Sequence, residues 1–266
     1  MDFSRFDYGV LHEDQRARLG IGITDINGER WGYIRVREVM SAGHIVRAST
    51  TADLGAANPI VVTAASPIKS DKITTTNGFV VSDVTQDLRG CLGWISAGKG
   101  IGQQFYILEN DDDTAKVFVL TGNTNRNKNY GFPVALDADS RVTLLFPGEG
   151  RQGDGVTDIV QGVMMEAATA DDIGKFCWVK RSGLAPVRVD ASGMDLTLGG
   201  IVVSAGNGLA VGHATAARGI GRGLAISDNI QDAEDYIAFI HLDIPDSPLS
   251  YAYANTQNGY NLVTVR

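Results

Sequence analysis

Two short acidic motifs are the first candidates for chemistry in this chain of 266 residues. The sequence SDVTQD at 82–87 recurs as SDNIQD at 227–232. Carboxylates and hydroxyls at a repeated spacing could hold a metal ion or a sugar. However, no histidine or third acid repeats with them, and Ser and Asp also bond their own backbone where a strand ends in a turn. We therefore favour a structural role for both motifs.

Other polar patterns also favour turns over catalysis. The acidic run NDDDT (110–114) could bind calcium, but the matching segment NTQNG (255–259) is a hairpin signal. The four histidines share no ligand spacing. The segments GKGIG (98–102) and GIGRG (219–223) lack the Lys-Ser/Thr ending and the long helix of a phosphate loop, and no hydrolase motif occurs. The sequence thus predicts no catalytic residues, no cofactor, no metal site and no enzyme activity.

The elements that would position these residues are predicted to be strands. Asn27-Gly28 and Asn77-Gly78 each stand between alternating apolar segments, as in hairpins whose turn residues both take positive φ. Only residues 158–168 have a helical pattern. Further strands are predicted at 44–48, 59–63, 92–95, 105–108, 116–121, 141–146, 175–180, 186–189, 201–204, 223–227, 236–242 and 261–265.

The chain repeats itself at an offset of 145 residues. GFVVSDVTQDLRGCLGWIS (78–96) and GLAISDNIQDAEDYIAFIH (223–241) share six of nineteen positions, where chance gives roughly one. Residues 24–35 align with 169–180, and 105–121 with 250–266. Residues 44–64 resemble 185–205 at an offset of 141, and such a slip belongs in surface loops.

This repeat predicts the domain organisation. We expect a mainly β protein with little helix, built from two tandem related barrel-like or sandwich-like domains that arose by duplication. An N-terminal arm covers residues 1–18 and the first β domain residues 19–121. A linker with one candidate strand covers 122–155, and the second β domain covers 156–266.

The composition and charge of the chain disfavour nucleic acid and membranes as partners. The net charge is −8 and the pI is about 5.0, and no basic patch with aromatics occurs, so nucleic-acid binding is disfavoured. We find no signal peptide and no apolar run that could span a membrane. Cys91 and Cys177 stand in apolar strand patterns and are expected to be small buried hydrophobes. Trp31, Trp94 and Trp178 align with other large aromatics, which favours core or interface filling over a sugar platform.

Three segments resemble a known family. LGIGITDINGERWGYIRVREVMSAGHIV (19–46) has a Leu-Gly strand, a D-x-x-G turn, an aromatic strand and an Ala-Gly before an aliphatic strand. This order resembles the opening of tailed-phage head decoration, or capsid cement, proteins. ATADDIGKFCWVKRSGLAPVRV (168–189) and residues 214–242 are similar to the same group, so the resemblance covers about two thirds of the chain.

The resemblance implies a structural virion protein. It would be made in the host cytoplasm and sit on the outer surface of an icosahedral head, where it bridges and stabilises major capsid protein subunits, commonly as a homotrimer. The family supplies no catalytic residues. Alternatives are a tail-fibre or host-binding glycan module, which needs Trp94 or Trp178 exposed, and a β-rich hydrolase, which needs an acid pair.

The candidate shell contacts lie in the N-terminal arm. Its first residues place aromatic side chains among charges, which is typical of a tail that docks on another surface. The predicted contacts are Phe3, Arg5, Phe6 and Tyr8.

Overall fold

The computed structural model confirms a mainly β protein. It describes residues 7–17, 19–50, 53, 60–63, 70–76, 88, 91–111, 113–120, 131–155, 158–190, 192–193, 196, 198–213, 219–224 and 236–244. Helix is confined to short 3-10 turns among these residues, and η3 (Ala170–Asp172) and η4 (Gly206–Gly208) are described in full. By contacts the chain divides into two units. Unit 1 is Met1–Ala48 with Pro147–Arg266, and unit 2 is Ser49–Phe146.

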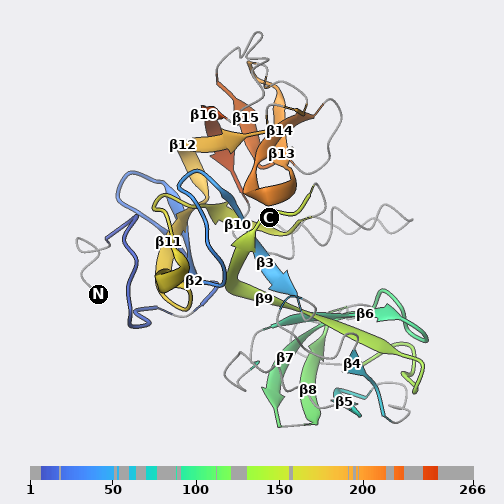
Figure 1. The fold of residues 1–266 in the computed structure, drawn as a ribbon. Coiled ribbons are helices and arrows are strands. Elements are labelled where there is room, and N and C mark those ends of the chain that lie inside the picture. Colours follow the sequence, from blue (N-terminus) through green and yellow to red (C-terminus); the bar gives the residue numbers. More distant parts are fainter. Residues whose placement is uncertain are drawn as a thin grey trace. The chain divides into compact units, whose positions relative to one another are not determined.

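Unit 1 contains a sheet built from distant parts of the chain (Figure 1). Its strand order is β1-β2-β11-β10-β3, and the last residues of β9 pair in parallel with β2. Because β2 and β11 bond each other along their length, the units do not coincide with the predicted boundaries at residues 121 and 156. The strands are β1 (Gly22–Thr24), β2 (Arg30–Val36), β3 (Ile45–Thr50), β9 (Arg141–Gln152), β10 (Val160–Val163) and β11 (Phe176–Lys180).

The pairing of β2 with β11 brings repeat-related positions together. Trp178 lies opposite Tyr33, and these residues are equivalent at the offset of 145. The antiparallel pair is therefore locally two-fold symmetric about this position. Other pairings differ between the halves, since β6 pairs with β9 whereas its counterpart β16 pairs with β12. The repeated motifs SDVTQD (82–87) and SDNIQD (227–232) lie outside the described residues. The duplication therefore stays a prediction.

The β1–β2 hairpin forms as predicted but with a different turn. Gly28 has φ +79°, whereas Asn27 is not among the residues with positive φ. The Gly28 N–H donates to Asp25 O and the Asp25 N–H to Glu29 O, which is a type I turn followed by a glycine bulge. The Asp25 carboxylate fixes this turn, because its Oδ1 accepts the N–H groups of Asn27 and Glu29, both at 2.9 Å.

The helix predicted at 158–168 is wrong. Residues Val160–Val163 form β10, and all four are buried. β10 pairs with β3 on one side and β11 on the other. A strand that is covered on both faces reads as a continuous apolar run, and such a run cannot be told from a buried helix by its period.

A closed barrel forms the rest of unit 1 (Figure 1, orange to red). The strand order is β12-β14-β13-β15-β16, and β16 returns to pair with β12 over eight residue pairs. Alternate side chains fill its interior, and closure leaves no unpaired sheet edge. The strands are β12 (Ser182–Val189), β13 (Ile201–Ser204), β14 (Ala210–His213), β15 (Gly221–Gly223) and β16 (Tyr236–Asp243). Its inward residues include Ala185, Val187, Val189, Val202, Ile240 and Leu242.

A buried arginine stands between β11 and β12. The Arg181 side chain is 1% exposed, and its guanidinium donates to Gln161 O at 2.7 Å and to Gln161 Oε1 at 3.0 Å. Gly32 is required here, because a Cβ at this position would lie 2.5 Å from Arg181 Nε. The charged group is thus satisfied by hydrogen bonds, as burial demands.

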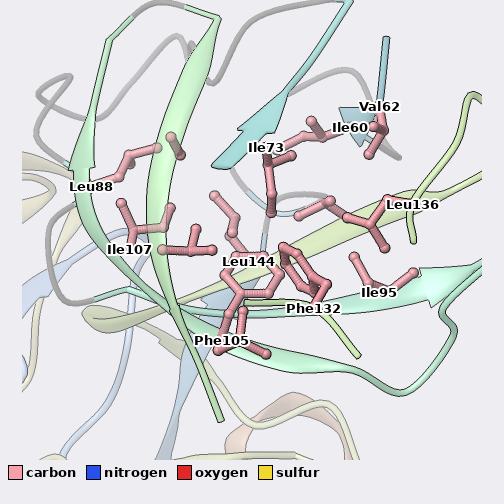
Figure 2. Packing of buried hydrophobic residues seen from close by; sticks show 14 of the residues in the cluster. Ile60, Val62, Ile73, Leu88, Ile95, Phe105, Ile107, Phe132, Leu136 and Leu144 are labelled. Atoms are coloured by element: carbon pink, nitrogen blue, oxygen red, sulfur yellow. The ribbon is translucent and has the colours of Figure 1, made fainter. Parts of the chain in front are cut away.

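Unit 2 packs its strands around a phenylalanine pair (Figure 2). The order is β9-β6-β7-β8-β5, and β4 also pairs with β9. Phe105 and Phe132 meet edge to face at 5.6 Å, and Gly93 leaves room for the Phe105 ring, which a Cβ would approach to 2.4 Å. The strands are β4 (Ile60–Val61), β5 (Lys72–Thr74), β6 (Leu92–Ala97), β7 (Gln104–Asn110) and β8 (Thr114–Val119).

Most predicted strands overlap observed ones; the first is 44–48, which overlaps β3, and the last is 236–242, which overlaps β16. The segment at 98–102 is the turn between β6 and β7, and that at 219–223 leads into and includes β15. The predicted strand at 261–265 and the hairpin at Asn77-Gly78 lie outside the described residues.

Candidate interaction surfaces

The described residues do not assemble a metal centre. Nowhere in that part of the chain do three His, Cys, Asp or Glu side chains come together. Asp111 and Asp113 are exposed at the turn between β7 and β8, with the Asp111 N–H donating to Thr114 O. Neither 3-10 turn in the described part of the chain approaches the length and hydropathy of a membrane span.

The cysteines lie in the apolar packing that the sequence predicts. Cys177 is 1% exposed in the core of unit 1, and Cys91 is half-buried against the core of unit 2. Burial raises the pKa of the Cys177 thiol to about 12, because a thiolate would lose its hydration. Since the thiolate is the reactive form, this cysteine is inert in the folded protein.

Asp158 is a buried carboxylate that fixes the loop between β9 and β10. Burial raises the pKa of Asp158, and several donors oppose that rise. Its Oδ2 accepts the N–H groups of Asp154 and Gly155 and the hydroxyl of Ser204, the last at 2.9 Å. These bonds hold the segment between β9 and β10, so we assign Asp158 a structural role.

An aromatic cluster covers one face of the unit 1 sheet. Trp31, Tyr33 and Trp178 form its buried centre, and Phe176 packs at its side. Trp31 donates from Nε1 to Asp25 Oδ2 at 3.1 Å, so the same carboxylate that fixes the hairpin also orients the indole. The Trp178 side chain is only 3% exposed. The glycan-binding alternative therefore loses Trp178 as a platform, and the remaining candidate, Trp94, is half-buried.

The described part of the N-terminal arm lies on this cluster. Tyr8 stacks on Trp31 with ring centroids 4.4 Å apart. His12 and Phe176 exchange two backbone hydrogen bonds at 2.7 and 2.8 Å, and the Arg16 N–H donates to the Tyr33 hydroxyl. Of the predicted shell contacts, Tyr8 thus packs partly on its own chain.

The other three predicted contacts, Phe3, Arg5 and Phe6, lie outside the described residues. The structure accordingly does not bring the four candidate side chains together in one described site. Their role in binding a shell stays a prediction.

A second surface was missed by the sequence reasoning. Four large apolar side chains point outward from β12 and β16 and from the residue after β15. They are Leu184, Leu224, Ile237 and Phe239, with exposed fractions of 50%, 45%, 58% and 54%, and we call them the barrel outer face. The signal was present in YIAFIHLD (236–243), where apolar residues occupy both parities of the strand and one parity must face outward.

Comparison with known proteins adds no relative. No family model matches the chain, and neither a curated protein nor a solved structure matches it. Function must therefore be argued from the surfaces of this chain and from the sequence resemblance.

Proposed function

We propose that this protein is a capsid decoration protein of a tailed phage. It binds the outer surface of an icosahedral head, bridges neighbouring major capsid protein subunits and associates with itself, as a homotrimer. Two of its three resembling segments, 19–46 and 168–189, carry the proposal. They contribute β2 and β11, which are neighbours in one sheet, so this part of the resemblance falls on adjacent strands.

The surfaces of the described residues support an adhesive role. The barrel outer face gathers four large exposed apolar side chains on adjoining strands, and exposed apolar patches often mark protein–protein interaction sites. A protein that binds only the assembled shell stabilises that shell by mass action and needs no catalytic group.

Copy number tests the proposal. Particles of the source virus are purified, and copies of this chain per particle are counted by quantitative mass spectrometry. We expect hundreds of copies in a simple ratio to the major capsid protein. A few to a few dozen copies would instead place the chain in a tail or fibre, and none at all would remove it from the virion.

The N-terminal arm gives a more specific prediction. Removing residues 1–6 takes away Phe3, Arg5 and Phe6, and it leaves Tyr8 on Trp31 and His12 on Phe176. We expect shell binding to be lost while the fold persists, since the contacts of Tyr8 with Trp31 and of His12 with Phe176 stay in place. Co-sedimentation with undecorated heads measures binding. Tyr8→Leu is the control variant, because it changes one residue of the arm and leaves residues 1–6 in place. Equal binding by the truncated and full chains would contradict the role of residues 1–6.

A further inference from the structure

We propose that His12 makes the docking of the N-terminal arm pH-dependent. At neutral pH the described part of the arm, residues 7–17, lies on the sheet of unit 1, and in mild acid it opens more often. This behaviour belongs to the isolated chain, so it goes beyond the decoration function and needs no phage shell.

The arm is held by contacts on both sides of the unit 1 sheet. His12 forms an antiparallel bridge with Phe176, the first residue of β11, through two backbone hydrogen bonds. Side chains alternate between the two sides along an extended segment, and bridge partners share a side. Leu11 packs with the cluster that contains Cys177, whereas Tyr8 and Phe176 pack on the aromatic cluster. The bridge therefore places His12 on the aromatic side of the sheet.

Docking takes the His12 side chain out of water. The residue is 5% exposed, and within the described residues its imidazole forms no hydrogen bond. A buried imidazolium would lose its hydration without gaining a partner. Burial, and then the positive charge of Arg16, lower the pKa of His12, whereas the negative charge of Asp7 opposes this shift. When the arm opens, the imidazole returns to water, where it binds a proton more readily.

The acidic residues of the arm do not compensate for a proton on His12. Asp7 is the carboxylate that favours the imidazolium, but its side chain is 61% exposed and lies 3.7 Å from Arg16. Glu13 and Asp14 follow His12 in the chain and are both exposed, so solvent and salt screen their charge.

The charged groups of the sheet beside this contact already have partners. Lys175 precedes Phe176 and lies 2.9 Å from the Asp172 carboxylate. Arg35 lies opposite Phe176 on β2 and forms an ion pair with Glu149. The tyrosines on this side are neutral at pH 7 and below, because burial raises the pKa of each; they are Tyr8 and Tyr33.

Linkage gives the direction of the pH effect. Because docking lowers the pKa of His12, the docked arm binds fewer protons than the open arm. Docking is therefore strongest above the ordinary histidine pKa of 6.5, and its stability is lost as the pH falls below that value. A single proton changes the opening constant by at most about tenfold per pH unit.

Amide hydrogen exchange measures how often the arm opens. Protection factors, which correct for the intrinsic effect of pH on exchange, are compared between about pH 7.5 and about pH 5.5. We expect the N–H groups of His12 and Phe176, which join the arm to β11, to lose protection in acid. The amides of β13, in the barrel, should keep theirs. A wild-type chain whose arm contacts are equally protected at both pH values would overturn the proposal.

His12→Gln removes the titrating group and keeps a polar side chain. Whatever its protection at neutral pH, we expect the arm contacts of this variant to lose the pH dependence. His213→Gln is the matched control, because His213 lies half-buried on β14 in the barrel. It should keep the wild-type pH dependence. A pH dependence that persists in His12→Gln, or that disappears in His213→Gln, would assign the effect to another group.

Asp7→Asn tests the electrostatic origin at an exposed residue. It removes the carboxylate that favours the imidazolium and leaves the imidazole in place. We expect a larger loss of protection at about pH 5.5 than in wild type, because the docked arm then resists the proton more strongly. A smaller loss in Asp7→Asn would contradict the role of His12 and overturn the proposal.

Discussion

Replacing Glu149 by alanine should cost about 3–5 kcal/mol of folding stability, the usual penalty for removing one partner of a buried ion pair. Glu149 lies on β9 and its side chain is 3% exposed. It accepts hydrogen bonds from Arg35 at 2.5 Å and from Arg37 at 2.5 Å. Without the carboxylate, two largely buried guanidinium groups at the end of β2 would lose the anion that they share. Urea unfolding measures the loss, and hydrogen exchange should locate it in β2 and β9.

A less buried ion pair next to the same strands provides the control. Arg151 and Glu38 are 3.5 Å apart, with side chains 25% and 33% exposed. Glu38→Gln keeps the oxygen that accepts the Gln152 N–H and should cost no more than about 1 kcal/mol, since exposed pairs contribute little. If Glu149→Ala cost no more than Glu38→Gln, the buried triad would not stabilise unit 1.

Local chemistry made much of this fold predictable. The β1–β2 hairpin was visible in Asn27-Gly28, and β13 and β16 were visible as short apolar segments. The hairpin prediction nevertheless named the wrong turn, because the decisive group is the Asp25 carboxylate, whose bonds depend on where the chain folds back. Residues 158–168 failed for a related reason, since burial on both faces removes the periodicity that separates strand from helix.

Long-range pairing was beyond the sequence. Nothing in the composition of 30–36 says that it will lie beside 176–180, yet the two strands pair inside unit 1. The repeat did align these two strands, but alignment states similarity and not contact.

The two candidate surfaces also differ in how far the sequence could predict them. Aromatic residues among charges pointed to the N-terminal arm, and Tyr8 is found on Trp31. The barrel outer face depends on which parity of β16 faces inward, and closure with β12 decides that.

The second large effect on stability is expected at Gly98, in the turn of unit 2 that also contains Gly102. Gly98→Ala should destabilise the protein by about 3 kcal/mol or more, because strain and overlap add. Gly98 has φ +76°, which an L-residue adopts at a cost. A Cβ there would also lie 1.9 Å from Asp139 O, in the neighbouring turn of 137–140. That turn is held in place by the Ser140 hydroxyl, which donates to Lys99 O at 2.8 Å, so it cannot withdraw freely.

Gly102 separates the two causes, because it lies in the same turn with the same strain and no overlap. Its φ is +85°, and a Cβ added to it would meet no atom within 4 Å beyond its chain neighbours. Gly102→Ala should therefore lose only the conformational penalty of about 1–2 kcal/mol. Chemical unfolding of both variants gives the difference, and hydrogen exchange should show lost protection in β6 and β9 for Gly98→Ala. Equal losses in the two variants would mean that the turn at 137–140 yields to the added methyl group, and that the close approach of the two turns does not hold unit 2 together.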